Sequence, residues 1–118
     1  SYVPQNTDSL SGSLGEYARQ YGIEESLFKA VLDKLGFRKK DFSADLSAMS
    51  AGQKKKAALA RSLCESAHLY IWDEPLNYID VISREQIEEL ILAFRPSLLF
   101  VEHDSAFLRN VATKIIRM

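Results

Sequence analysis

The 118 residues are enough for one domain with a hydrophobic core, and their composition (47% hydrophobic, 26% charged) is ordinary for a soluble globular protein. Fifteen basic and sixteen acidic side chains nearly cancel, so net charge favours binding neither to nucleic acid nor to a membrane surface. The single cysteine, Cys64, excludes an intrachain disulfide framework and a cysteine zinc cluster. Because no apolar run has membrane-spanning length and the N-terminus does not resemble a signal peptide, we expect a cytoplasmic protein without membrane insertion.

The first half of the chain predicts a strand end followed by helices. Residues 1–4 are typical of the end of a strand, and the small polar residues of 5–13 favour a loop. Apolar residues at helical spacing predict helices over 14–21 and 24–35, each closed by a glycine. The basic patch at 38–40 is expected to be a solvated turn. The predicted apolar stripe of the second helix is Leu27, Phe28, Val31, Leu32 and Leu35.

The second half alternates between strand and helix patterns. Ser50 and Gln53 form a capping box for a helix that runs to about Glu65, and Asp80 or Ser83 caps a later helix. The expected order after the first of these helices is strand 69–73, a helix stopped by Pro96, strand 98–101, a helix around 107–111 and a short strand at 115–116. This βαβαβ order predicts an α/β fold with a parallel sheet.

The most informative stretch is the apolar run 69–72, which ends in two adjacent carboxylates, Asp73 and Glu74. Four consecutive apolar residues are typical of a strand buried on both faces, and ligands of open α/β sheets bind at the carboxyl ends of strands. The other apolar strand, 98–101, is followed by His103. An acid for Mg²⁺, an acid that orients water and an imidazole facing a phosphoryl group would suit nucleotide hydrolysis. The alternatives are a helix-capping turn at the acids and a structural loop histidine.

The helix that begins at Ser50 offers a second candidate site. A serine, small residues and backbone N–H groups at a helix N-terminus can bind an anion, and Gly52 permits close backbone approach. An ordinary capping box is the alternative. Residues 54–56 are three lysines, which we expect to form a solvated helix face rather than a phosphate-binding one.

Taken in order, these residues resemble the ATPase domain of ATP-binding cassette (ABC) proteins. Residues 2–5 resemble the Q-loop, and 50–53 resemble the signature motif, with Ala51 where the family usually has glycine. Residues 69–73 are similar to the Walker B strand, 75–80 to the D-loop and His103 to the switch histidine. The resemblance divides the chain into a Q-loop strand end (1–5), a helical subdomain with the signature helix (6–66) and a partial α/β core (67–118).

The resemblance implies ATP and Mg²⁺ as cofactors and assigns roles to individual residues. Asp73 and Gln5 would lie near Mg²⁺, while Glu74 would be the catalytic glutamate and His103 would act with it on the hydrolytic side. A second ABC domain, in the same chain or a dimer, would hold the nucleotide faced by the signature motif. The residues implied to contact nucleotide or to lie at the cassette interface are Gln5, Ser50, Gly52, Gln53 and Asp80.

The family's phosphate-binding loop, G-x-x-x-x-G-K-[ST], does not occur in these 118 residues, since no glycine precedes a lysine. The resemblance therefore implies the C-terminal part of a P-loop NTPase-like cassette. We expect these residues alone to be inactive, and their uncovered apolar sheet surface to favour self-association.

Finer details resemble the ABC-F group, and within it the antibiotic-resistance proteins that protect ribosomes. These details are Gln53 with the three lysines at 54–56, the loop 74–80, and the segment 101–104 followed by Phe107 and Leu108. This implies a ribosome or ribosomal RNA as partner. The alternatives are the ATP-binding subunit of a membrane transporter and, in a different class, a non-catalytic interaction module that keeps the cassette fold.

Overall fold

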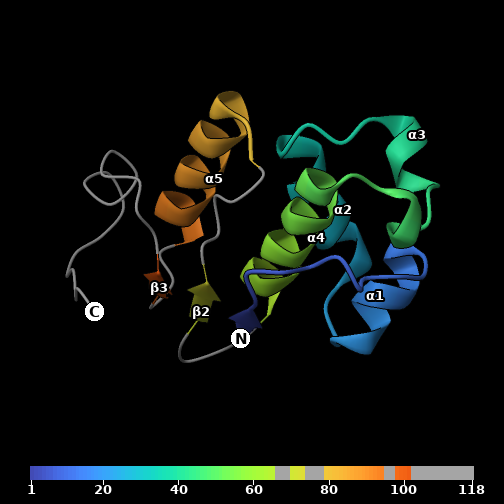
Figure 1. Cartoon of the computed structure of the whole chain (residues 1–118), viewed down its shortest axis with the longest axis horizontal. Helices are drawn as coiled ribbons and strands as arrows, with labels where there is room; N and C mark the ends of the chain where they lie inside the picture. Colours follow the sequence, from blue (N-terminus) through green and yellow to red (C-terminus); the bar gives the residue numbers. More distant parts are fainter. Residues whose placement is uncertain (66–69, 74–78, 95–97, 102–118) are drawn as a thin grey trace.

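The computed structural model describes residues 1–65, 70–73, 79–94 and 98–101. In this part of the chain a three-stranded sheet stands beside a group of helices (Figure 1). Its strands are β1 (Tyr2–Val3), β2 (Tyr70–Asp73) and β3 (Leu98–Val101), and they are ordered β1-β2-β3. Both pairs of neighbours are parallel, with Val3 opposite Trp72 and Asp73 opposite Val101. The predicted parallel sheet is therefore confirmed.

The helices form mostly where the hydrophobic spacing predicts them. Their bounds are α1 (Leu14–Gln20), α2 (Glu25–Lys34), α3 (Lys39–Phe42), the 3-10 helix η1 (Leu46–Ala48), α4 (Ala51–Cys64) and α5 (Val81–Phe94). Within the described ranges, no helix combines the length and the apolar character needed to cross a membrane. The predicted helix around 107–111 and strand at 115–116 lie outside the described residues.

Local sequence signals explain where the helices begin and end. Ser13 caps α1 by accepting a hydrogen bond from the backbone N–H of Glu16 at 3.1 Å. Gly22 and Gly36 follow α1 and α2 with φ of 66° and 91°, a region that side chains with a Cβ rarely adopt. The cap at Ser50 and the helix ends at Gly22 and Gly36 could be predicted from the sequence, because each depends only on residues a few positions apart.

Helix α4 lies between the sheet and the helices of the first half of the chain (Figure 1). Its alanines at positions 57, 58 and 60 are fully or almost fully buried, and such small side chains allow neighbouring elements to approach closely. Trp72 of β2 is also fully buried and donates its indole N–H to the hydroxyl of Ser62 in α4 at 2.8 Å. Val3 of β1 shares this inner face, so the sheet and the helices belong to one continuous hydrophobic core.

The opposite face of the sheet is open. Tyr2 and Ile71, which are paired in register on β1 and β2, are 55% and 39% exposed. The prediction that strand 69–73 is buried on both faces is therefore wrong for Ile71. Alternate side chains of a strand point to opposite faces, so Tyr2 and Ile71 lie on the face opposite the buried Val3 and Trp72.

Two further predictions need correction. Leu27, assigned to the inner stripe of α2, is 41% exposed, whereas the other members of that stripe are buried. Residues 38–40 are solvent-exposed as expected, but Lys39 and Lys40 begin the short helix α3 rather than forming a turn. The carboxylate of Asp41 accepts a 2.7 Å hydrogen bond from the backbone N–H of Arg38, and this contact starts the helix.

Candidate functional site

The carboxyl ends of the three parallel strands define the candidate site. The register sets Val3 beside Trp72, so β1 ends next to the end of β2, and Asp73 is the last residue of β2, beside Val101 of β3. Gln5 follows Val3 by two residues and leaves the sheet at this same edge. For Asp73 the structure describes the backbone, while the predicted catalytic residues Glu74 and His103 lie outside the described residues.

The segment that carries Gln5 is held by lysines of α4. Lys55 is fully buried, and its ammonium donates to the backbone carbonyls of Pro4 at 3.2 Å and Gln5 at 2.5 Å. Lys54 donates to the carbonyl of Asp8 at 3.0 Å. The side chain of Gln5 is exposed to solvent. The prediction of a fully solvated lysine face at 54–56 is therefore wrong, because Lys55 faces the polypeptide that leaves β1.

The N-terminus of α4 has the predicted capping box. Ser50 accepts a hydrogen bond from the backbone N–H of Gln53 at 3.1 Å, and the Gln53 side-chain oxygen accepts one from the backbone N–H of Ser50 at 3.0 Å. The Gln53 amide also donates to Asp41 at 3.2 Å. The first N–H groups of a helix have no partner inside it, so those of Ala51 and Gly52 point out of the N-terminus toward any anion bound there.

Asp80 has a structural contact of its own. Its carboxylate caps α5 by accepting hydrogen bonds from the backbone N–H of Ser83 at 2.7 Å and from the Ser83 hydroxyl at 3.1 Å. These bonds, with a smaller contribution from the ammonium of Lys56 at 3.9 Å, hold the pKa of Asp80 below its usual value. The prediction that either Asp80 or Ser83 is the cap is settled in favour of Asp80.

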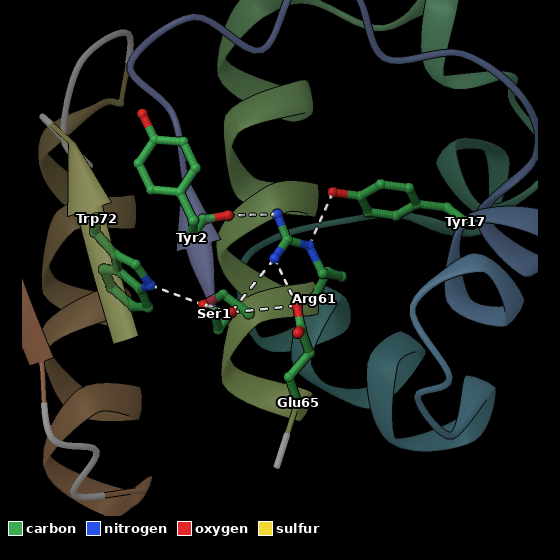
Figure 2. Close-up of polar contacts among 7 residues, drawn as sticks. Ser1, Tyr2, Tyr17, Arg61, Glu65 and Trp72 are labelled. Atoms are coloured by element: carbon green, nitrogen blue, oxygen red, sulfur yellow. Dashed lines mark hydrogen bonds and ion pairs between the residues drawn. The ribbon is translucent and has the colours of Figure 1, made fainter. Parts of the chain in front are cut away.

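Arg61 of α4 is a buried cation at the centre of a hydrogen-bond network, which the sequence did not lead us to predict (Figure 2). It is 3% exposed, and its guanidinium donates to the Tyr17 hydroxyl at 3.2 Å, the Tyr2 carbonyl at 3.0 Å and the Glu65 carboxylate at 2.5 Å. The guanidinium carbon also lies 4.2 Å from the centre of the Tyr21 ring, a cation–π contact. Burial raises the pKa of Tyr17, an effect that the charge of Arg61 partly opposes.

A sequence signal for one of these buried cations was available. Lys55, Ala58 and Ser62 follow the i, i+3, i+7 spacing of one helix face, and Ala58 and Ser62 are small residues of the kind that line close contacts. Because these three positions lie on one face of the helix, the small residues predict that Lys55 is buried with them, in spite of its charge. Long basic side chains can extend through apolar surroundings to reach a polar acceptor.

Two residues with oxygen-bearing side chains leave adjacent strands at the carboxyl edge of the sheet. Among the described residues, no group of three or more histidine, cysteine, aspartate and glutamate side chains could hold a metal ion. The carboxylate of Asp73 and the amide oxygen of Gln5 are nevertheless hard oxygen donors, and their backbones leave adjacent strands at one sheet edge. Mg²⁺ in nucleotide sites is typically bound by one or two such protein ligands together with phosphates and water. The donor set therefore fits Mg²⁺.

Comparison with known proteins identifies the family. The family model described as "ABC transporter" matches residues 1–77, more than half of the chain. The chain belongs to this ABC family. The ATP-binding protein Uup of Haemophilus influenzae is 40% identical over 92 residues, which cover 78% of this chain and 14% of Uup. The ABC transporter F family member 2 of Arabidopsis thaliana is 28% identical over 90 residues, or 76% of this chain and 13% of that protein.

A solved structure agrees with this assignment. The archaeal ribosome recycling factor aABCE1, in complex with the ribosomal stalk protein aP1, superposes with a TM-score of 0.78 at 26% identity. The match covers 91% of this chain and 22% of that one, which agrees with the family assignment. The chain spans only about a seventh of the curated relatives described above, at 14% and 13% of their lengths.

Proposed function

We propose that this chain supplies part of the nucleotide site of a longer ABC-type ATPase. In this proposal Gln5 and Asp73 bind Mg²⁺, Glu74 orients and deprotonates the attacking water, and His103 faces the transferred phosphoryl group. The observation that carries the proposal is the parallel register, in which β1 and β2 end side by side so that Gln5 and Asp73 leave the same sheet edge. Ligands of parallel α/β sheets bind at such edges.

The chemistry follows from the residue types. Mg²⁺ bound at this edge would neutralise phosphate charge as the terminal phosphoryl group is transferred to water. A glutamate directly after the metal-binding aspartate lies in the chain where it can accept a proton from that water, a role that usually contributes about 10²–10⁴-fold to rate. Within the present 118 residues no glycine-rich loop supplies the phosphate cradle. We therefore propose that residues outside these 118 supply the phosphate-binding loop of the longer protein.

The N-terminus of α4 is proposed to face a nucleotide held by a second ABC domain. Ser50, Gly52 and Gln53 would contact its phosphates, because the outward N–H groups and the positive end of the helix dipole favour negative charge. Asp80, at the start of α5, is proposed to lie near the boundary between the two domains, where its side chain is 66% exposed.

The test of this function uses the longest natural chain that contains these residues. Glu74→Gln removes the proposed base while keeping the size of the side chain, so we expect ATP binding to persist and turnover to fall by about 10²–10³-fold. Glu89→Gln, an exposed glutamate of α5, is the matched control and should leave turnover unchanged. Equal turnover of the wild-type protein and Glu74→Gln would remove Glu74 from the base role. No hydrolysis by the wild-type chain would favour a non-catalytic interaction module.

We further propose that the longer protein containing this chain is an ABC-F protein that acts on the ribosome and protects it from antibiotics. The support is its similarity to an F family member and to the ribosome recycling factor aABCE1. The Glu74→Gln variant with ATP should co-sediment with ribosomes, and wild-type expression should raise the antibiotic concentration that inhibits growth. Failure to co-sediment, together with co-purification of a membrane permease, would favour the transporter alternative.

The exposed face of the sheet supports the proposal that the 118 residues self-associate. Tyr2 and Ile71 form an exposed apolar pair, and such sheet surface favours association. We expect the 118 residues alone to self-associate through it. Sedimentation velocity over a wide concentration range measures this, and Tyr2→Ser/Ile71→Thr should shift the equilibrium toward monomer. A wild-type fragment that stays monomeric at every concentration would argue against this contact.

A further inference from the structure

The ammonium of Lys55 contacts the backbone beside the proposed metal ligand Gln5. Lys55 has no exposed surface, and its ammonium lies 2.5 Å from the Gln5 carbonyl oxygen and 3.2 Å from that of Pro4. Removing an ammonium from water is costly unless hydrogen bonds compensate. A buried lysine that donates to two consecutive carbonyls therefore restricts where this backbone can lie.

Two cations of α4 contact the backbone of β1 and of its flanking residues, beside a 2.6 Å hydrogen bond between the hydroxyls of Ser1 and Ser62. Arg61 donates to the carbonyl of Tyr2 near the start of the strand, and Lys55 donates just beyond its end. The two cations lie six positions apart on α4, a rise of about 9 Å. Because Arg61 already holds the strand itself, Lys55 mainly controls the direction in which the chain leaves the sheet.

The residues that follow Gln5 are also tied to their surroundings. Asn6 accepts a hydrogen bond from the backbone N–H of Asp8 at 2.8 Å, and the N–H of Leu10 donates to the Thr7 carbonyl at 3.2 Å. Lys54 contacts the Asp8 carbonyl. The exposed Gln5 side chain is thus carried by a backbone with a defined path, and Lys55 contacts the carbonyl of Gln5 itself.

We propose that Lys55 is a positioning residue that orients Gln5 toward a divalent cation bound at the carboxyl edge of the sheet. The metal role of Gln5 rests on the proposed function, whereas the contact between Lys55 and the backbone does not. The ligand class is a divalent cation that accompanies nucleotide phosphates. Loss of the ammonium would release the Pro4–Gln5 backbone and lower the affinity of the site for the metal without changing any residue that touches it.

The first experiment measures amide hydrogen exchange in the longest natural chain that contains these residues, without nucleotide. Lys55→Met keeps the length of the side chain but removes the donor. Lys29→Met is the control, because Lys29 is an exposed lysine of α2 paired with Glu25 at 3.3 Å. We expect exchange at Asp8 and Leu10 to rise about tenfold or more in Lys55→Met, with the amides of α2 unchanged. Unchanged exchange over 5–10, or an equal rise over 5–10 and α2, would overturn the proposal.

If Lys55→Met does not fold, the contact between Lys55 and Gln5 can be tested by NMR in the wild-type protein. With ¹⁵N-lysine and ¹³C-carbonyl labelling, a hydrogen-bonded Lys55 ammonium should exchange slowly with water. It should also show a coupling through the hydrogen bond to the carbonyl carbon of Gln5. A Lys55 ammonium in fast exchange without this coupling contradicts the contact.

The second experiment addresses the link to the metal. The Mg²⁺ concentration for half-maximal ATP hydrolysis should rise about tenfold in Lys55→Met and stay unchanged in Lys29→Met. A merely structural role would lower the amount of active protein but leave this concentration unaltered. Raised exchange over 5–10 with an unaltered Mg²⁺ requirement therefore overturns the metal link. A wild-type protein that does not hydrolyse ATP refutes the proposed function instead, while the exchange measurement still decides whether Lys55 positions the segment.

Discussion

Replacement of Arg61 by methionine tests whether the buried guanidinium holds β1 and α1 against α4. The substitution keeps most of the apolar stem but removes the donors to the Tyr17 hydroxyl, the Tyr2 carbonyl and the Glu65 carboxylate. Breaking a buried charged pair typically costs about 3–5 kcal/mol, because the remaining polar groups keep their desolvation penalty. The Glu65 side chain is 22% exposed and can regain water, so we expect the lower end, about 3 kcal/mol.

Urea unfolding followed by tryptophan fluorescence is the assay. Trp72 is the only tryptophan of the chain and is fully buried, so its emission should report directly on the loss of the core. With a slope of about 2 kcal/mol per M of urea, a loss of about 3 kcal/mol lowers the midpoint by about 1.5 M. Lys29→Met removes a pair in which both side chains are more than 40% exposed, and should cost about 0.3–0.5 kcal/mol.

The outcome that contradicts the reasoning is an Arg61→Met midpoint no lower than that of Lys29→Met. A double-mutant cycle with Tyr17→Phe gives a second check, because Phe removes only the hydroxyl that Arg61 contacts. We expect a coupling energy of about 1–3 kcal/mol between the two positions. Additive effects would show that the guanidinium and the hydroxyl do not interact in solution.

Three further predictions concern the cap of α4, the cysteine and the nucleotide. Ser50→Ala should destabilise the fold by about 1 kcal/mol through loss of the capping box, measured by urea unfolding, whereas a cost below that of Lys29→Met would contradict the cap. Burial raises the pKa of the Cys64 thiol to about 11, so thiolate forms only at higher pH in the folded state. Alkylation of the native protein at pH 8 should therefore be roughly 100-fold slower than in urea, and equal rates would refute the shift. Calorimetry should show no micromolar ATP binding by the 118 residues alone, because the phosphate loop is not among them.

The sequence predicted much of the element order because the signals for it are local. The apolar spacing of 14–18 and 28–35 marked α1 and α2, and Ser50 with Gln53 marked the start of α4. Two apolar runs separated by a helix predicted neighbouring parallel strands, and β2 and β3 are paired in that way. Each of these features depends on residues within a few positions or on a connection that can adopt essentially one topology.

The errors share one cause, which is that burial depends on residues distant in sequence. Ile71 was expected to be covered, but the pleat turns it to the face opposite the buried Trp72, and its side chain is partly exposed. Leu27 fits the apolar period of α2 but lies at the edge of the stripe, beyond the core. The structure also shows that Asp80 rather than Ser83 caps α5, a choice that the sequence alone left undecided.

The sequence by itself determined the helices and their caps, the two apolar strands and the order of motifs that the ABC family shares. Only the tertiary structure showed that α4 carries two buried cations, one at each end of β1. Lys55 reaches carbonyls 50 and 51 positions earlier in the chain, and Arg61 reaches one that is 59 positions earlier. From their charge alone, the side chains of Lys55 and Arg61 are predicted to be exposed to solvent. A buried cation becomes stable only where folding brings acceptors to it from a distant segment.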